Sequence, residues 1–203
     1  MAEIRGVIFD FGRVICNFDI RRFVSRMAPY STQTLGQLLA GISASGPIER
    51  RYETGIITSG QFYDEISRLA NLHMPEDEFI HAYTEIFSPI PETFALIRRL
   101  KGKYKLGLLS NTSEWHYLHG IRTVEVFPLF DAVTLSFEVG AMKPDRKIYE
   151  DMASKLHLAP NACIYIDDVK ENVDGGSAFG FSSIHYTGHA ELLAALAELG
   201  VVI

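Results

Sequence analysis

Residues 4–10 read Ile-Arg-Gly-Val-Ile-Phe-Asp, a short apolar run that ends on an acid. Its length and its β-branched side chains are typical of a buried strand. Similar runs recur later in the chain, and segments of helical period separate the last of them. The predicted later strands are Tyr104–Ser110, Ala132–Ser136, Ala162–Ile166 and Ser182–Tyr186, and the predicted helices are Pro144–Leu156, Glu171–Phe179 and Ala190–Leu199. This alternation predicts an α/β fold with a Rossmann-like parallel sheet, covered by helices on both faces.

The stretch from residue 16 to residue 88 has a different character, because it contains no convincing strand. It is much longer than an ordinary crossover connection of about a dozen residues. Helix signals are present within it, including a capping box formed by Thr58 and Gln61. We therefore predict an α/β core made of residues 1–15 and 89–203, with residues 16–88 forming a small α-helical cap over the strand ends.

The composition of the chain limits its partners. Hydrophobic residues make up 47% and charged residues 22%, as in ordinary globular proteins. The formal net charge of −6 argues against nucleic acid as a partner, and no apolar stretch is long enough to span a bilayer. The first residues lack the basic and apolar regions of a signal peptide, so a cytoplasmic location is expected. Cys16 and Cys163 are too few for a disulfide framework and are expected to be buried thiols.

Four of the predicted strands are followed by polar or reactive side chains. In open parallel sheets, ligands bind outside the carboxyl ends of the strands. The groups at those ends are Asp10, Ser110-Asn111-Thr112, Lys143 in the loop after Ala132–Ser136, and Asp167-Asp168. A single acid after a strand commonly does no more than cap the next helix. The presence of a serine, a lysine and an acid pair at the other ends argues against coincidence.

Phosphoryl transfer requires this mixture of groups. A carboxylate such as Asp10 can attack phosphorus, which splits a difficult hydrolysis into two easier steps. Because two anions must then be brought together, a hard divalent cation is needed, and Asp10 and Asp168 are its natural ligands. Lys143 can neutralise phosphate charge, Ser110 can donate a hydrogen bond, and Gly12 lets backbone amides approach the phosphate closely.

These motifs resemble those of the haloacid dehalogenase superfamily, whose members are mostly phosphatases. The matching stretches lie in family order between residues 4 and 180, and the helical insertion resembles the first type of cap (C1) in that family. The stretches are Ile8–Val14, Leu109–Thr112, Gly140–Asp145 and Ile166–Asp168, with Asn172 and Gly175. More narrowly, the set looks like the bacterial α-D-glucose-1-phosphate phosphatase group.

The resemblance implies a role for each matched residue. Asp10 would be the nucleophile that forms an aspartyl-phosphate, with Ser110 and Lys143 as further catalytic residues. The implied phosphate-binding residues are Phe11, Gly12, Ser110, Asn111 and Lys143. Mg²⁺ would be held by Asp10, the backbone carbonyl of Gly12 and Asp168, with Asp167 acting at one remove, for example through a water.

The chain departs from the family pattern at Gly12. Most phosphatases of the superfamily place a second Asp there, two residues after the nucleophile, as general acid and base. Such catalysis is typically worth about 10²–10⁴-fold. The glucose-1-phosphate phosphatase group is similar to this chain in having Gly at that position. The identity of the proton donor is therefore left open, as is the choice of cap residues that face the substrate, for which Arg51, Tyr52 and Glu53 are candidates.

The predicted function is that of an Mg²⁺-dependent phosphomonoester hydrolase acting on a small phosphorylated metabolite, with sugar phosphates as candidates. One alternative is a metal-independent 2-haloacid dehalogenase, which also lacks the second Asp but resembles a Ser-Ser-Asn pattern where this chain has Asp167-Asp168. Another is a weakly active phosphate-sensing or interaction domain. A phosphoacceptor receiver domain fits less well, because it lacks a long helical cap. The sequence does not predict the oligomeric state.

Overall fold

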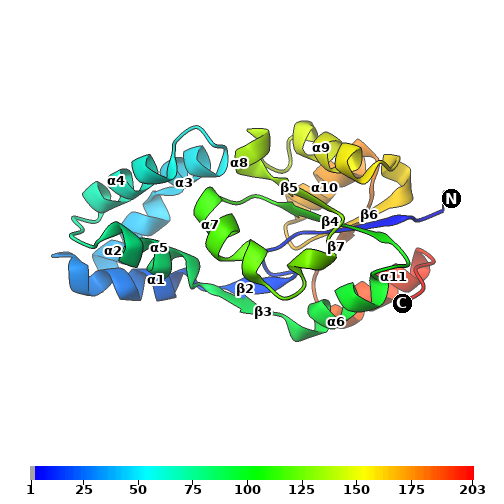
Figure 1. Ribbon diagram of the computed structural model, residues 1–203, viewed down its shortest axis with the longest axis horizontal. Coiled ribbons are helices and arrows are strands. Elements are labelled where there is room, and N and C mark those ends of the chain that lie inside the picture. The colour runs from blue at the N-terminus through cyan, green and yellow to red at the C-terminus, as the bar shows by residue number, and fades with distance from the viewer. Residues whose placement is uncertain (1–2) are drawn as a thin grey trace.

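A five-stranded parallel sheet forms the centre of the protein (Figure 1). The computed structural model describes residues 3–203, and the strand order is β5-β4-β1-β6-β7. Every neighbouring pair in this sheet is parallel, which confirms the predicted α/β class. The strands are β1 (Gly6–Phe9), β4 (Lys105–Ser110), β5 (Ala132–Leu135), β6 (Cys163–Asp167) and β7 (Ser182–His185).

The central strand β1 is buried on both faces because helices cover both sides of the sheet. Val7 and Phe9 pack in one hydrophobic cluster with α6 (Pro91–Leu100) and α11 (His189–Glu198). Ile8, which points to the opposite face, packs in a second cluster with α9 (Arg146–Leu156), and α10 (Lys170–Phe179) lies beside α9. All three side chains are 0% exposed, so a strand without polar alternation is the expected sequence here.

The predicted elements of the core differ from the observed ones only at their ends. Helix α9 begins at Arg146, two residues later than predicted, because Asp145 caps it by accepting a hydrogen bond from the backbone N–H of Lys147 at 2.8 Å. The helix ends where His157 adopts a left-handed conformation with φ of 53°. The remaining short helices of the core are α7 (Glu114–His119), α8 (Ser136–Val139), η2 (Ile121–Thr123), η3 (Phe127–Leu129) and η4 (Pro160–Ala162).

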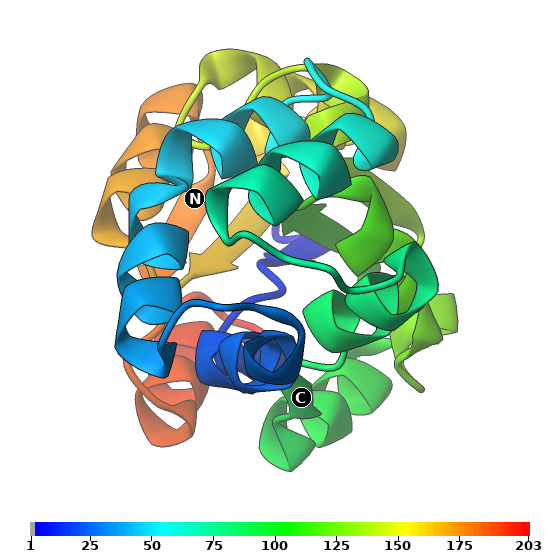
Figure 2. The same cartoon turned by 90° about the vertical axis from the view of Figure 1, so that its left-hand side faces the viewer.

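Five α-helices lie between β1 and α6, beyond the carboxyl ends of the strands (Figures 1 and 2). They are α1 (Ile20–Met27), α2 (Leu35–Ala44), α3 (Gly46–Glu53), α4 (Ser59–Leu69) and α5 (Glu76–Thr84), with the 3-10 turn η1 (Ala28–Tyr30). Their apolar faces form a separate hydrophobic cluster, in which Phe23, Phe62 and Phe79 are buried. The capping box of α4 is present as predicted. The limits 16–88 of a cap domain stay a prediction.

The expectation of no strand between residues 16 and 88 is wrong at the two ends of that stretch. Strands β2 (Cys16–Phe18) and β3 (Phe87–Pro89) pair antiparallel, with Phe18 opposite Phe87. Each has only three residues, which is too short for a two-residue period to be recognised in the sequence. The pairing places the two connections to the helices side by side.

Cys16 and Cys163 are free and buried, as expected. Within residues 3–203, none of the helices combines the length and the apolar composition needed to cross a membrane.

Truncation of Ile8 tests the packing of the central strand. We expect Ile8→Ala to lower the free energy of unfolding by about 2–5 kcal/mol, because it leaves a cavity between β1 and α9. The matched control is Ile56→Ala, whose side chain is 71% exposed and whose loss should change stability by less than about 0.5 kcal/mol. Urea unfolding measures both, and equal losses would contradict the assignment of Ile8 to the core.

Candidate active site

Three of the residues predicted for the site lie at adjacent strand ends. Asp10 directly follows β1, and Ser110 and Asp167 are the last residues of β4 and β6, the two neighbours of β1. The backbone N–H of Asp10 donates to the carbonyl oxygen of Ile166 at 2.9 Å, so the hydrogen bonds between the strands fix the position of Asp10. All three side chains are buried. The carboxyl edge of the sheet therefore brings these polar groups together.

The ammonium group of Lys143 connects these strand ends. Lys143 lies between α8 and α9, and its Nζ donates to Asp10 Oδ1 at 2.5 Å and to Asp167 Oδ2 at 2.7 Å. Its third hydrogen bond goes to the carbonyl oxygen of Leu109 at 3.2 Å. The side chain of Asn111 holds this loop in place, since it accepts from the backbone N–H of Lys143 at 2.8 Å and donates to its carbonyl oxygen at 3.2 Å. The side-chain amide of Asn111 thus positions Lys143.

Asp167 is surrounded by hydrogen-bond donors, whereas Asp10 has one. Oδ1 of Asp167 accepts from the backbone N–H of Val169 at 2.8 Å and from the side chain of Asn172 at 3.1 Å. Its Oδ2 accepts from the hydroxyl of Tyr165 in addition to Lys143. Both oxygens of Asp167 are therefore engaged within the protein. Asp10 accepts a side-chain hydrogen bond from Lys143 alone among the described residues.

This difference sets the charge of the two acids. Burial raises the pKa of Asp10 to about 7, although Lys143 opposes the effect. Burial acts in the same direction on Asp167, but Lys143 and the other donors outweigh it and hold its pKa below the usual range. For Lys143, burial alone would lower the pKa, yet the two carboxylates raise it above the ordinary value. Lys143 and Asp167 therefore favour each other's charged form, whereas the charged form of Asp10 is incompletely compensated.

The chemistry of the donor set fits a divalent cation. Asp10, Asp167 and Asp168 each offer a carboxylate oxygen within 4.8 Å of the others, and Mg²⁺ prefers such oxygens. Burial, followed by the charge of Asp167, raises the pKa of Asp168, and its nearest cation is the exposed Arg13 at 4.0 Å. One buried ammonium thus faces three carboxylates, which leaves negative charge for a metal to neutralise. Since both oxygens of Asp167 are engaged, Asp10 and Asp168 are the carboxylates with capacity to bind it.

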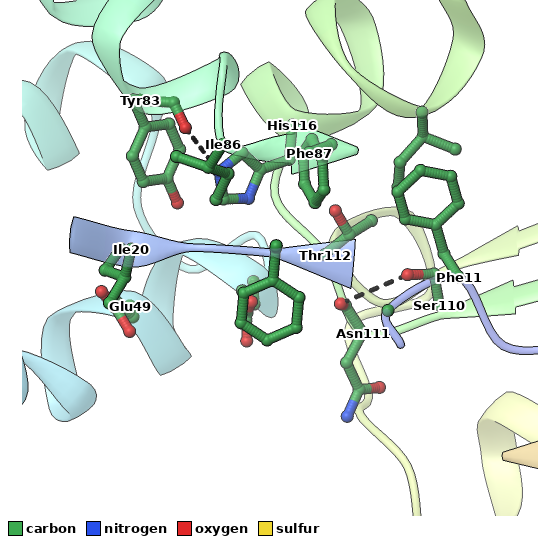
Figure 3. Close-up of a pocket in the computed structure, with 14 residues that line it drawn as sticks. Phe11, Ile20, Glu49, Tyr83, Ile86, Phe87, Ser110, Asn111, Thr112 and His116 are labelled. Atoms are coloured by element: carbon green, nitrogen blue, oxygen red, sulfur yellow. Dashed lines mark hydrogen bonds between the residues drawn. The ribbon is translucent and has the colours of Figure 1, made fainter. Parts of the chain in front are cut away.

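A cavity of about 280 Å³ lies between the strand ends and the helices α1, α3 and α5 (Figure 3). Its floor includes Gly12, Ser110 and Asn111, which the sequence predicts to bind phosphate. Phe11 also lines it and packs edge-on against Phe87, with ring centroids 5.2 Å apart. The remaining lining residues come mostly from the helical part, by which we mean the stretch from β2 to β3 that contains α1–α5. They are Phe18, Ile20, Glu49, Glu53, Tyr83, Ile86, Thr112, His116 and Ile121.

Sequence reasoning did not identify most of the far wall of this cavity. No sequence signal separates Glu49 and Tyr83 from surface and packing residues. The helical period shows that a helix has an apolar face, but it does not show which of its residues face the core of the protein. Of the three candidates Arg51, Tyr52 and Glu53, only Glu53 lines the cavity. Tyr52 is buried in the helical cluster, and Arg51 pairs with Glu65.

The chain belongs to the haloacid dehalogenase-like hydrolase family, which it matches over residues 4–180. The predicted family is thereby confirmed, as is the expectation of a hydrolase. The narrower resemblance to the glucose-1-phosphate phosphatase group stays a prediction.

The proteins that are similar to this chain over most of its length include a phosphatase and a nucleotidase. The chain is 25% identical to D-ribitol-5-phosphate phosphatase of Bacteroides thetaiotaomicron, over 89% of this chain and 90% of that one. It is 28% identical to a pyrimidine 5'-nucleotidase of Escherichia coli strain K12, over 90% and 86% of the two chains. The structure of a haloacid dehalogenase family enzyme of Bacteroides thetaiotaomicron, in complex with magnesium and inorganic phosphate, has the same fold (TM-score 0.78, 22% identity, 89% and 93% coverage).

Replacement of Lys143 tests the charge balance of the site. We expect Lys143→Met to lower the free energy of unfolding by about 3–5 kcal/mol in chelator, because it leaves two buried carboxylates without their cation. The same change at the exposed Lys147, four residues later, should cost less than about 1 kcal/mol. Adding Asp10→Asn to Lys143→Met should recover part of the loss, since it removes one of the uncompensated charges. Urea unfolding of the three variants and the parent measures this, and equal effects at the two lysines would disprove the bridge.

Proposed function

We propose that the protein is an Mg²⁺-dependent phosphomonoester hydrolase with Asp10 as its nucleophile. The observation that carries the proposal is the surrounding of Asp10: Lys143 binds one carboxylate oxygen at 2.5 Å, and the acids Asp167 and Asp168 lie beside it. The other oxygen, Oδ2, lies toward Gly12, 3.8 Å from the position that a β-carbon would take there, and Gly12 lines the cavity. A phosphate ester in the cavity would therefore meet the free oxygen of Asp10.

The charges of the site assign the supporting roles. Lys143 would neutralise the phosphate while keeping the orientation of Asp10, and Ser110 would donate its hydroxyl to a phosphate oxygen. Backbone amides after Asp10, at Phe11 and Gly12, and the segment at Asn111 would complete the phosphate site. Mg²⁺ would be held by Asp10, Asp168 and the carbonyl of Gly12, and it would neutralise charge between carboxylate and phosphate. Asp167 would act indirectly, by fixing Lys143.

The raised pKa of Asp10 is consistent with this arrangement. A carboxylate must be ionised to attack phosphorus, and burial disfavours the ionised form of Asp10. A cation bound next to Asp10 would favour ionisation again, so that nucleophile and metal site depend on each other. Attack by Oδ2 would form an aspartyl-phosphate, and a water molecule would then cleave it.

The size of the cavity supports a small substrate. A volume of about 280 Å³ is at the lower limit of the roughly 300–1,000 Å³ of ligand pockets in general. Relatives that cleave D-ribitol 5-phosphate and pyrimidine 5'-nucleotides point to the same class of small phosphorylated metabolites, with sugar and polyol phosphates as first candidates. A metal-independent haloacid dehalogenase is disfavoured by the acid pair, because two acids beside the nucleophile serve best where a cation must be held.

Phosphate release from a panel of phosphomonoesters tests the proposal. We expect turnover with MgCl₂ and its loss in EDTA, and Asp10→Asn should reduce kcat/KM by about 10³-fold or more, because the amide is not a nucleophile. Asp64→Asn, the same change at an exposed site in α4, is the control and should leave kcat/KM unchanged. Undiminished activity of Asp10→Asn would refute the mechanism, and turnover of a 2-haloacid in EDTA would establish the dehalogenase instead.

A further inference from the structure

Cleavage of an alkyl phosphate poses a problem that the residues described so far do not solve. The leaving alkoxide is a strong base and must receive a proton as the bond to phosphorus breaks. Gly12, beside the nucleophile, has no side chain to supply it. The space above Gly12 is filled, since a β-carbon there would lie 3.3 Å from Cε1 of Phe18. A side chain that donates the proton would therefore have to come from another part of the cavity wall.

Three titratable groups near the cavity are unsuited to this role. Burial lowers the pKa of His116 to about 4, and its Nε2 lies 3.0 Å from the carbonyl oxygen of Tyr83 (Figure 3). Because a carbonyl only accepts, Nε2 carries the single proton of the neutral ring, and the other nitrogen has none to give. Burial raises the pKa of the Tyr83 hydroxyl well above its usual value, which makes it a weak acid. Lys143 uses its three protons on Asp10, Asp167 and Leu109.

Two acids from α3 remain in the cavity wall, Glu49 and Glu53. Glu49 accepts a hydrogen bond from the hydroxyl of Ser45 at 3.3 Å, at the start of the helix. Glu53 is the last residue of α3, one turn further along, and none of the hydrogen bonds of the described residues involves its carboxyl group. Glu53 is also the one of the two that stands next to the contacts between α3 and the core, because the preceding residue, Tyr52, bonds to the backbone of Trp115.

Contacts of its sequence neighbours with the core hold Glu53 in the cavity wall. The hydroxyl of the preceding residue, Tyr52, bonds to Ser59 at 2.7 Å and accepts from the backbone N–H of Trp115 in α7 at 3.1 Å. Two residues after Glu53, Gly55 has φ of +68°, and a β-carbon there would lie only 2.4 Å from the carbonyl oxygen of Phe137 in α8. This close approach requires glycine. Glu53 is therefore positioned by the docking of the helical part on α7 and α8.

We propose that Glu53 is the general acid and base of the reaction, in an inference that rests on the proposed phosphomonoesterase function. In the first step, the bond from Asp10 Oδ2 to phosphorus forms, the bond from phosphorus to the ester oxygen breaks, and the proton of Glu53 moves to that oxygen to give the alcohol. In the second step, Glu53 takes a proton from water, the water oxygen bonds to phosphorus, and the bond to Asp10 breaks. Inorganic phosphate leaves, and Glu53 is protonated again.

The electrostatics of the wall suit both steps. Burial, followed by the negative charge of Glu49, raises the pKa of Glu53 to about 7, against the opposing charges of Lys143 and Arg50. An acid with this pKa is present in both forms at neutral pH, so it can donate and accept. Since the first step needs the protonated form, kcat/KM for an alkyl phosphate should fall as the pH rises above about 7.

Leaving groups of different basicity test the role of Glu53. We expect Glu53→Gln to lower kcat/KM for the best alkyl phosphate of the panel by about 10²–10⁴-fold and to remove its decline above pH 7. With 4-nitrophenyl phosphate, whose leaving group needs no proton, kcat/KM should change less than about threefold. Because the second step also loses its base, that substrate should show a burst of one 4-nitrophenolate per active site before slow turnover. Glu53→Asp should recover part of the alkyl phosphate activity.

Three comparisons make the outcome decisive. Glu85→Gln, the same change at an exposed acid of the helical part, should behave as the parent, and the unfolding temperature of each variant reports on its fold. Equal losses by Glu53→Gln on both esters would overturn the proposal, as would the leaving-group pattern appearing in Glu49→Gln instead. Asp10→Asn distinguishes a failure of the proposed function from a failure of the role of Glu53. If Asp10→Asn retains turnover, the proposed function is wrong. If Asp10→Asn is inactive and Glu53→Gln is not impaired, only the role of Glu53 is wrong.

Discussion

The bridge from Lys143 to Asp10 and Asp167 is the interaction on which the site depends. It joins three separate stretches of the chain, the ends of β1 and β6 and the loop before α9, through one buried ammonium group. Burying charges is expensive unless they are paired and hydrogen-bonded. The structure meets this requirement for Lys143, with three acceptors, and for Asp167, with donors on both oxygens. It leaves Asp10 incompletely paired, and the proposed role of Asp10 as nucleophile rests on that remaining imbalance.

The sheet explains why the bridge forms at this place. β1 lies between β4 and β6 and is buried on both faces. Asp10, the polar residue that directly follows β1, therefore lies between the ends of the two neighbouring strands. The same burial that stabilises the fold removes water from around Asp10 and raises its pKa. The central position of β1 thus accounts both for the burial of the strand and for the raised pKa of the acid that follows it. The parallel register extends this to Ser110 and Asp167, which stand at the same edge.

The sequence predicted the sheet and its polar edge because both depend on local patterns. An apolar run ending at Asp10 and an acid pair after Ile166 are visible without a structure, and the rule for parallel sheets then places them together. Of the wall formed by Glu49, Glu53 and Tyr83, only Glu53 was among the candidates from the sequence, since the wall depends on how one group of helices docks on another. β2 and β3 escaped prediction for a related reason: each is stabilised by a partner about seventy residues away rather than by its own pattern.

The pairing of β2 with β3 has a mechanical consequence. The hydrogen-bonded ribbon ties together the two connections to the helices α1–α5, so that neither can shift without the other. Phe18 and Phe87 face each other across this ribbon, and both line the cavity. Phe18 is also the residue that fills the space above Gly12. The ribbon that joins the helices α1–α5 to the core therefore also forms part of the cavity wall beside Asp10.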